Sequence, residues 1–571
     1  MGKISNVLET YHNLFEEKKG SFLFYYSFDS EKNVKVKSYS REEFLVLCRR
    51  AANVLKSFGI AKGDCVLHCF SSNSVDDIIF RTAATMIGVI PVTVNWQADT
   101  NEQIVYKARV TGCSLVIADE GFDEDTLKNL KSVLDINVFY AEKLCNYSCI
   151  EEKYIADLNH SDPKIVIFTS GTTGRPKGVE LSYKAYETNR MTFEAFLNIK
   201  HEDSLAVILV NPMYHTNSSA IVDWALRKPN SEVHLVERYT SNYWKLLTDI
   251  VEMNYDRLVA PLVSKHFSFL DNLYKMKQLP VGLDILQNRM DKVDFLLGSA
   301  PVGPKTLRHV GHFTNKMPLV RFGSTETCLQ VLGIPYKIPE GQIMEMFRKG
   351  WEHRYNEEPQ PGYYIGRPHP PHTEIRVVKS ISLEDKNFMK DCEEGEPGYI
   401  VTKGSNLMSK YVNEPEATEA VFFDSWYTGL KDICFYLKGK DGEPDYFWLS
   451  RDSMLLIKGG VNYSYEQINN ELISFVEVHY GLDKFDFDLA VVGLKVDSEY
   501  EDSCCVTIDL KNEKALRVKD EIEKSFLKEA CKRVSKGSIP EFLRFGNIPK
   551  NFKGAVEVKK LEEEFSKYLK K

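Results

Sequence analysis

The ten residues from Thr169 to Gly178 combine side chains that suit a phosphate-binding loop. Their sequence, Thr-Ser-Gly-Thr-Thr-Gly-Arg-Pro-Lys-Gly, holds four hydroxyl donors, three glycines and two cations. Glycines let a backbone approach a ligand closely and turn its N–H groups inward, which forms a nest for an anion. Ser170, Thr172 and Thr173 add hydroxyl donors, and Lys177 adds a compact positive charge. The stretch predicts a site for a phosphate-bearing ligand, although such residues also form ordinary surface turns.

The spacing of this loop differs from that of the P-loop found in kinases and GTPases. The P-loop requires Gly-x-x-x-x-Gly-Lys followed by Ser or Thr, whereas Lys177 lies three residues after Gly174 and is followed by Gly178. The loop instead closely resembles the phosphate-binding loop of the AMP-forming acyl-CoA synthetases. That superfamily also includes luciferases and the adenylation domains of peptide synthetases.

Two segments further along the chain resemble the same superfamily. Pro212–Asn217 (Pro-Met-Tyr-His-Thr-Asn) is similar to its histidine-bearing segment, which implies that His215 lies at the acyl pocket. A histidine taken alone is more often a packed or hydrogen-bonded residue than part of a site. Gly298–Pro301 resembles the loop that lies against adenine, where small residues such as Ser299 and Ala300 leave room for a flat base.

Phe322-Gly-Ser-Thr-Glu326 resembles the superfamily segment usually written Tyr-Gly-x-Thr-Glu. The resemblance implies that Phe322 offers an aromatic face to adenine. It also implies that Thr325 donates to the α-phosphate and that Glu326 is an oxygen ligand for Mg²⁺.

A ribose-binding carboxylate is expected two residues later than the superfamily places it. Residues 407–418 and then Trp426-Tyr-Thr-Gly429 match the superfamily, which continues at once with an Asp that binds both ribose hydroxyls. Here Leu430 follows, so we interpret Leu430 and Lys431 as an insertion and expect Asp432 to be the ribose carboxylate. The alternative is a solvated charge at the start of a strand.

The segment Leu449-Ser-Arg-Asp-Ser453 resembles the superfamily hinge. The resemblance implies that Arg451 reaches the ribose and phosphate, and that Ser453 stands at the pivot where Asp or Lys is usual. A glycine loop at 459–460 follows. Such a hinge fits a two-step reaction in which the small domain swings between adenylation of an acid and attack by a thiol.

The clearest departure from the superfamily lies near the end of the chain. Pro549–Val556 resembles Pro-Lys-Thr-x-x-Gly-Lys-Ile, whose second lysine bridges the carboxylate and the α-phosphate, but Ala555 occupies that position. Loss of one preorganised cation costs roughly 10²–10³ in rate by analogy with a lost oxyanion-hole donor. Lys553, in the same turn, is the candidate substitute.

The pattern of apolar residues predicts alternating helices and strands as the elements that position these side chains. Phe44, Leu47, Ala51 and Leu55 fall on one face of a helix expected over 41–60. Another helix is expected over 76–87, and the stretch 335–363 reads as a surface insertion with a helix-like piece at 344–355. Strands are expected at 65–70, 88–95, 114–118, 165–168, 206–210, 256–260 and 295–297. This alternation predicts an α/β fold with largely parallel sheets.

Length and composition agree with a multidomain globular protein. At 571 residues the chain is longer than one hydrophobic core usually supports. We expect a large N-terminal domain of stacked sheets with helices, 1–448, and a small mobile α+β C-terminal domain, 449–571. A net charge of −8 does not indicate the basic surface that binding of nucleic acid requires. Neither a membrane-spanning run nor a secretory signal is present, so a cytoplasmic location is expected. The twelve cysteines lack paired spacing and are expected to be reduced.

The resemblance implies ATP-dependent activation of a carboxylic acid, with a fatty acid expected, to an acyl-adenylate. Transfer to coenzyme A would follow, with release of AMP and pyrophosphate; the implied partners are the small-molecule acid, ATP, Mg²⁺ and coenzyme A. Catalytic roles are implied for Thr172, Lys177, Glu326 and Lys553, with Glu326 also the metal ligand. Nucleotide binding is implied for Thr169, Ser170, Gly171, Thr173, Gly174, Ser299, Ala300, Phe322, Thr325, Asp432 and Arg451.

Two other functions stay open. A non-catalytic paralogue that binds a nucleotide or an acyl-adenylate is favoured by Ala555, Ser453 and the displaced Asp432. Loading of a carrier-protein thiol is less favoured, because no carrier domain with an Asp-Ser-Leu attachment site follows.

Overall fold

The computed structural model describes most of the chain. The described residues are 11–15, 20–29, 31, 33–149, 156–169, 176–299, 301–356, 358–359, 362–451, 455–458, 461–483, 485–496, 498–550 and 556–570. The residues expected to form the site or the hinge that lie outside these ranges are Ser170, Gly171, Thr172, Thr173, Gly174, Ala300, Ser453, Gly459, Gly460, Lys553 and Ala555.

The largest sheet has fifteen strands, and their pairing changes from mostly parallel to antiparallel along the sheet. Its order is β2-β1-β10-β9-β11-β12-β13-β14-β17-β24-β23-β19-β22-β21, with β18 beside β19. The bounds are β1 Ser21–Phe28, β2 Val34–Ser40, β9 Leu205–Leu209, β10 Ser231–Val236, β11 Arg257–Leu262, β12 Val293–Leu297, β13 Leu319–Phe322, β14 Leu332–Gly333, β17 Tyr363–Pro368, β18 Thr373–Val378, β19 Gly398–Gly404, β21 Phe422–Phe423, β22 Trp426–Tyr427, β23 Asp432–Lys438 and β24 Pro444–Arg451.

From β1 through β10, β9, β11 and β12 to β13 the neighbours pair in parallel, as expected. From β13 onward they pair antiparallel, so the expectation of largely parallel sheets is wrong for the later half. The reason is the connections, since a short turn such as that between β23 and β24 permits only antiparallel pairing.

The second sheet carries the predicted phosphate-binding loop, residues 169–178, between β7 and β8. Its order is β20-β8-β7-β4-β3-β5-β6, with bounds β3 Cys65–Cys69, β4 Ile90–Thr93, β5 Leu115–Ala118, β6 Asn137–Tyr140, β7 Pro163–Thr169, β8 Lys177–Ser182 and β20 Lys410–Tyr411. Strands β7 and β8 pair antiparallel, with Thr169 opposite Lys177. The two ends of the predicted phosphate loop are therefore fixed side by side.

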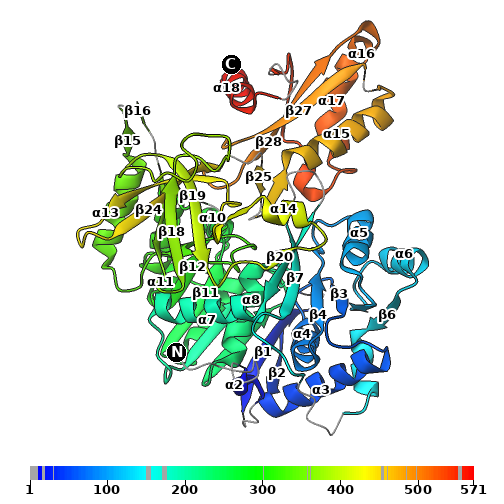
Figure 1. The fold of residues 1–571 in the computed structure, drawn as a ribbon, viewed down its shortest axis with the longest axis vertical. Coiled ribbons are helices and arrows are strands. Elements are labelled where there is room, and N and C mark those ends of the chain that lie inside the picture. Colours follow the sequence, from blue (N-terminus) through cyan, green and yellow to red (C-terminus); the bar gives the residue numbers. More distant parts are fainter. Residues whose placement is uncertain are drawn as a thin grey trace.

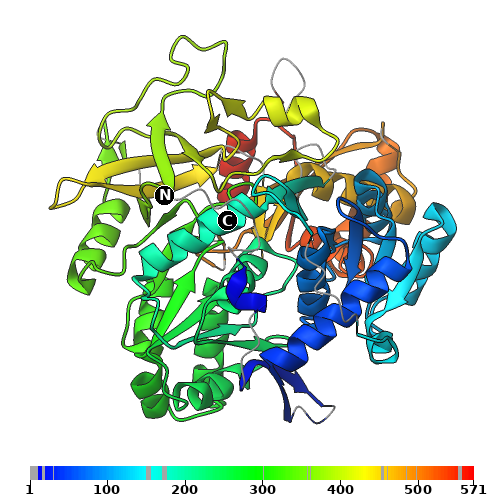
Figure 2. The same ribbon diagram turned by 60° about the horizontal axis from the view of Figure 1, so that its bottom comes forward.

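Helices fill the space between the two sheets and cover their outer faces (Figures 1 and 2). One core joins Leu209 and Leu235 of the large sheet to Leu115 and Ile117 of the second through residues of α3, α4, α7 and α8. The bounds of the helices in this part of the chain are α2 His12–Phe15, α3 Arg41–Ser57, α4 Val75–Ile87, α5 Asn101–Thr111, α6 Glu124–Leu134, η1 Ala141–Asn146, α7 Tyr183–Leu197, α8 Thr216–Arg227, α9 Tyr243–Val251, α10 Ser264–Lys275, α11 Leu283–Met290, α12 Pro304–Thr314, α13 Glu340–Trp351 and α14 Pro415–Glu419.

Helix α3 shows why these sequences fold as they do. Ser40 accepts a hydrogen bond from the backbone N–H of Glu43, whose side chain accepts from the backbone N–H of Ser40 in return. This capping box starts the helix, and Phe44, Ala51 and Leu55 are buried on one face. The expected face is confirmed, and the helix ends at Ser57 rather than residue 60.

The stretch around α13 is packed more deeply than a surface insertion. The helix begins at Glu340, four residues before the expected position, and Phe347 is fully buried with Ile343 and Met346 in the core of the large sheet. Strands β15 Arg354–Tyr355 and β16 Glu358–Pro359 then pair as a short hairpin. Ile343, Met346 and Phe347 of this stretch are core residues, whereas Met344 is exposed.

The C-terminal part forms two small sheets, β25-β26 and β27-β28-β29, and stands at one end of the molecule (Figure 1). Its elements are β25 Leu455–Lys458, β26 Val461–Ser464, α15 Tyr465–Tyr480, β27 Phe487–Leu494, β28 Ser503–Leu510, α16 Glu513–Arg517, α17 Lys519–Ala530, η2 Lys536–Ser538, β29 Phe542–Phe545 and α18 Val558–Leu569. Leu561 and Phe565 of α18 are fully buried. Tyr500 bonds to Ser268, and Lys265 lies 3.2 Å from Glu501, so this part is tied to α10.

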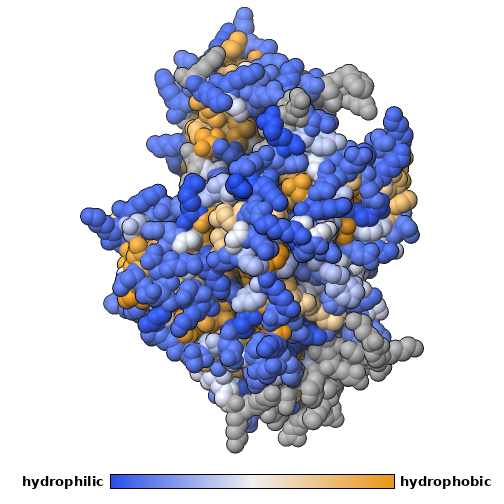
Figure 3. Space-filling view, turned by 90° about the vertical axis from the view of Figure 1, so that its left-hand side faces the viewer, coloured by the Kyte–Doolittle hydropathy of each residue, from blue (hydrophilic) through white to orange (hydrophobic). Residues whose placement is uncertain are grey.

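The division at 448/449 stays a prediction, and β24 continues in the large sheet to Arg451. Figure 3 shows one face of the molecule as mostly hydrophilic, with hydrophobic side chains in small groups. Across the described residues, no helix combines the length and hydropathy needed to cross a membrane. The cysteines are all free thiols and most of them are buried.

Candidate active site

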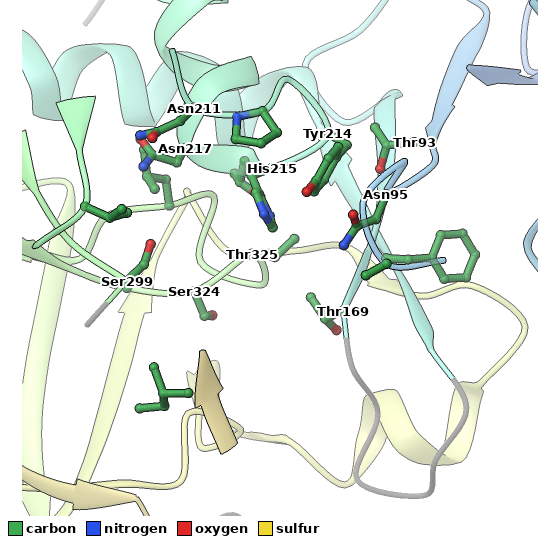
Figure 4. A pocket seen from close by; sticks show the side chains of 18 of the residues that line it. Thr93, Asn95, Thr169, Asn211, Tyr214, His215, Asn217, Ser299, Ser324 and Thr325 are labelled. Carbon is green, nitrogen blue, oxygen red and sulfur yellow. The ribbon is translucent and has the colours of Figure 1, made fainter. Parts of the chain in front are cut away.

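A cavity of about 610 Å³ gathers residues from both large sheets and from the C-terminal part. Eight of the residues predicted from sequence line it: Thr169, Lys177, His215, Ser299, Phe322, Thr325, Glu326 and Asp432. In Figure 4, His215 and Thr325 lie in the middle of the view, with Thr169 to one side and Ser299 to the other. These side chains come from positions up to 263 residues apart, so the fold rather than the local sequence brings them together.

Lys177 lines the cavity near the end of the predicted phosphate loop, opposite Thr169 in the β7–β8 pair. Its Nζ is 3.9 Å from Oε2 of Glu414 and 4.9 Å from the ring centroid of Tyr411. The side chain is 18% exposed. The long ion pair and the open side of the ammonium group leave Lys177 able to bind an anion.

Glu326 accepts hydrogen bonds from two hydroxyl groups of the second sheet, one on β20 and one on β7. Its Oε1 accepts hydrogen bonds from Tyr411 at 3.1 Å and from Thr169 at 3.5 Å. Burial, and next the charge of Glu326, raise the pKa of Tyr411 above its usual range, so its hydroxyl remains a donor. Tyr411 lies within a matched segment of the sequence, but its role was missed because only the structure shows which residue its hydroxyl meets.

Gly323 of the motif is required by the shape of the turn that carries Glu326. A Cβ at Gly323 would lie 2.0 Å from the carbonyl oxygen of Leu329. Only glycine permits this approach, which folds the chain back after β13. Thr325 and Glu326 are thereby placed at the edge of the cavity, half-buried.

No cluster of three or more potential metal-ligating side chains occurs in the part of the chain that the structure describes. A single carboxylate such as Glu326 still fits Mg²⁺, which is usually bound through one or two carboxylates together with substrate phosphates.

His215 stands directly before α8, in a group of aromatic side chains. Its ring centroid is 4.4 Å from that of Tyr214, which packs against Trp96 at 4.5 Å. Burial, and next the charge of Lys107, lower the pKa of His215 to about 4. The imidazole is therefore neutral at pH 7.

Asn73 fixes the backbone of the His215 segment. Its side-chain amide donates to the carbonyl oxygen of Val236 at 3.0 Å and accepts from the backbone N–H of Met213 at 2.9 Å. This role could not be predicted from sequence, because these two partners lie 140 and 163 residues away along the chain.

Asp432 begins β23 and is 2% exposed. Its Oδ1 accepts a hydrogen bond from Nε1 of Trp448 at 2.9 Å. The alternative of a solvated charge is therefore wrong, because a buried carboxylate at a cavity wall is not solvated. In the ladder Asp432 lies opposite Arg451, the last residue of β24, which the sequence also assigned to the nucleotide.

Two further residues of the cavity were not predicted. Arg321 of β13 is 4% exposed, and its Nη2 donates to Oδ1 of Asn217 on α8. A charged residue inside the apolar run Leu319-Val-Arg-Phe322 was the signal available in the sequence. Ser299, by contrast, was predicted, and its backbone has a positive φ of 67° beside the cavity.

The chain was compared with known proteins. The model of the family described as "AMP-binding enzyme" matches residues 25–412. A 2-succinylbenzoate–CoA ligase of Bacillus licheniformis is 25% identical over 75% of this chain and 78% of its own length. A crotonobetaine/carnitine–CoA ligase of Proteus mirabilis is 23% identical over 92% and 94%.

Solved structures agree on the fold. The o-succinylbenzoate CoA synthetase of Bacillus subtilis, bound with a product analogue, superimposes with a TM-score of 0.73 at 19% identity, covering 98% of each chain. ATP-bound MatB of Rhodopseudomonas palustris has a TM-score of 0.62 at 19% identity, covering 99% of each chain. At these identities the structures establish a shared fold.

Proposed function

Because the chain belongs to the AMP-binding enzyme family, we propose that it joins a carboxylic acid to the thiol of coenzyme A in two steps. In the first, a carboxylate oxygen attacks the α-phosphorus of ATP and the bond to pyrophosphate breaks, which leaves an acyl-adenylate. In the second, the thiol sulfur attacks the acyl carbon and AMP leaves. The family match, together with the eight predicted residues lining one cavity, carries this proposal.

Binding of the triphosphate is assigned to the hairpin end of the cavity. Lys177 supplies the positive charge, and Thr169 with the residues 170–174 supplies hydroxyl and N–H donors. Thr172 is proposed to contact the phosphates during the reaction. Glu326 would hold Mg²⁺, which when bound neutralises charge on the phosphates.

The nucleoside is assigned to the opposite wall. Phe322 would face the adenine, and Ser299 with Ala300 would lie along its edge. Asp432, with Arg451 opposite it in the sheet, would accept hydrogen bonds from the two ribose hydroxyls, for which a carboxylate has enough lone pairs. Thr325 would donate to the α-phosphate.

The second step is assigned to movement about the hinge at Ser453, with the glycine loop at 459–460 beside the path of the thiol. Ala555 stands where the superfamily has a lysine, so we propose that Lys553 supplies the missing charge or that adenylation is slow. Neither residue lies in the described part of the chain.

The acid is proposed here only as a carboxylic acid. A fatty acid was the expectation from sequence, and a long-chain-fatty-acid–CoA ligase of Mycobacterium tuberculosis is among the relatives, at 22% identity. Other relatives are named for 2-succinylbenzoate, crotonobetaine or carnitine, and 4-coumarate. These acids differ in size and charge, so the relatives do not select one. None of them supports a non-catalytic paralogue.

The test is formation of product from free acid. The protein is incubated with ATP, Mg²⁺, coenzyme A and each of a panel of acids, and acyl-CoA and pyrophosphate are measured. We expect equal amounts of acyl-CoA, AMP and pyrophosphate with at least one acid. ATP binding without any acid-dependent product, over a broad panel, would overturn the proposal.

A further inference from the structure

Arg321 is a buried cation at the wall of the cavity with unused hydrogen-bond donors. Its side chain is 4% exposed, and its contact within the described residues is the bond from Nη2 to Asn217. The atoms Nε and Nη1 are buried and have no hydrogen-bond partner among the residues that the structure describes. A buried donor without a partner is unusual, and a buried charge without one more so.

The described structure provides no carboxylate for this guanidinium. The other buried or half-buried cations of the cavity are paired, Lys107 with Asp99 and Lys177 with Glu414. Burial alone lowers the pKa of Arg321 to about 9, with no contribution from a neighbouring acid. Asn217 is a neutral partner, so it satisfies one donor and leaves the charge uncompensated. Arg321 is still charged at pH 7.

The guanidinium of Arg321 reaches Asn217 on α8, the helix that begins directly after His215. Side chains alternate along a strand, so Arg321 and Phe322 project to opposite faces of β13. The Cγ of Arg321 would lie 3.3 Å from a Cβ at Gly298, which shows that this glycine leaves space for the arginine. In Figure 4 its partner Asn217 lies well apart from Thr169, where the phosphate loop begins.

The wall around Arg321 is polar where a purely alkyl chain would need apolar contacts. Asn211, His215 and Asn217 lie on this side of the cavity in Figure 4. An acyl chain ending here in a methyl group would leave the guanidinium buried and unpaired. A chain ending in a carboxylate would instead pair with it.

We propose that Arg321 binds a second carboxylate of the substrate, so that the acid activated by this protein is a dicarboxylic acid. One carboxylate would be adenylated near Thr325, and the other would accept hydrogen bonds from the guanidinium at the far end of the acyl chain. This inference rests on the proposed function and narrows its substrate class.

Matched pairs of acids test the proposal directly. Malonate, succinate, glutarate and adipate are compared with propanoate, butanoate, pentanoate and hexanoate in acid-dependent pyrophosphate release. At the chain length that fits, we expect kcat/KM for the dicarboxylate to exceed that for its partner by about ten- to a hundredfold, the range for a charge-assisted hydrogen bond. A monocarboxylate preference at every length would overturn the proposal and leave the proposed function intact.

Substitution of Arg321 provides the second arm. Arg321→Met should lower kcat/KM for the dicarboxylate by about ten- to a hundredfold, mainly through KM, and change the monocarboxylate much less. The matched control is Arg238→Met, which removes a cation from the exposed rim of the same cavity and should affect both acids equally. An equal loss with both acids in Arg321→Met, or a higher KM for ATP with every acid, would assign Arg321 to the nucleotide and overturn the inference.

A binding measurement keeps the test independent of turnover. Stabilisation of the protein against heat by the preferred dicarboxylate should disappear in Asn217→Asp, because the new carboxylate would occupy the guanidinium. Without ligand, Arg321→Met should be at least as stable as wild type, since it removes an uncompensated buried charge. Undiminished stabilisation by the dicarboxylate in Asn217→Asp would contradict the inference. Absence of pyrophosphate with every acid would overturn the proposed function, and this binding test would still decide the role of Arg321.

Discussion

The hydroxyl of Tyr411 donates to Oε1 of Glu326 across 3.1 Å, which joins strand β20 of the second sheet to the turn after β13 of the large one. The proposed metal ligand is therefore oriented by a residue of the opposite sheet. Partners of this kind usually affect metal affinity as well as geometry.

Tyr411→Phe tests that relationship. The Mg²⁺ concentration that gives half-maximal pyrophosphate release should rise by about tenfold, within the range found when a residue that orients a metal ligand is lost. The control is Tyr446→Phe, whose hydroxyl donates to the backbone oxygen of Ile375 instead. If both variants need the same Mg²⁺ concentration, then Glu326 is not the ligand of the metal.

Lys177→Ala should weaken ATP binding by about 1.5–3 kcal/mol, the range for a hydrogen bond to a charged group. Calorimetry of the wild type and the variant measures the difference. Lys410→Ala is the control, because Lys410 lies on the adjacent strand β20 and pairs with Glu180 at 3.4 Å. If the folded Lys177→Ala protein binds ATP as tightly as the wild type, then Lys177 does not bind the phosphates.

Asp432→Asn should weaken AMP binding by about tenfold, because the neutral amide replaces a charged acceptor of the ribose hydroxyls. Asp424→Asn is matched to it, since Asp424 is exposed in the preceding turn and has a positive φ of 46° that Asn tolerates. If the two variants bind AMP alike, then Asp432 is not the ribose carboxylate and the insertion at 430–431 is misplaced.

His215 gives a prediction for pH. Burial lowers its pKa to about 4 in the folded protein, below the value of about 6.5 in an unfolded chain. Between these values the unfolded state binds more protons, so the contribution of His215 to stability is complete above pH 6.5 and is lost as the pH falls toward 4.

His215→Gln should therefore flatten the fall in unfolding free energy over this range, by up to about 1.4 kcal/mol per pH unit. Denaturant titrations at several pH values measure the slope. Other buried histidines, among them His234, His266 and His369, have lowered pKa values as well and will keep part of the slope. An unchanged slope in His215→Gln would mean that its imidazole is solvated.

Much of the site could be predicted because its motifs are local. The strand before the loop, the helix over 41–57 and the turn carrying Glu326 follow from periodicity, capping and glycine positions within a few residues. The antiparallel half of the large sheet was missed, because strand pairing depends on connections rather than on the apolar pattern of one strand.

The residues that could not be predicted from sequence contact partners that lie far away along the chain. Asn73 bonds to residues 140 and 163 positions away, and Tyr411 meets Glu326 across 85. Arg321 directly precedes the motif that begins at Phe322 and is not part of it. A charge within an apolar strand does not reveal its partners, and in the described part of the chain no acid pairs with this guanidinium.

The two half-reactions can be separated at position 555. Ala555→Lys restores the superfamily cation and should speed adenylation by one to three powers of ten, by the same reasoning as for an oxyanion-hole donor. Conversion of a supplied acyl-adenylate to acyl-CoA should change little. If Lys553 already supplies the charge, Lys553→Ala will abolish adenylation and Ala555→Lys will add little. If neither variant alters the rate, the segment 549–556 takes no part in adenylation.

Activation of a carboxylic acid as its adenylate is tested by acid-dependent exchange of labelled pyrophosphate into ATP. Exchange requires reversible formation of an acyl-adenylate and needs no coenzyme A, so it detects the first step even when transfer is slow. We predict exchange that requires both Mg²⁺ and an acid and that is lost in Glu326→Gln. ATP binding with no exchange for any mono- or dicarboxylic acid would contradict the account.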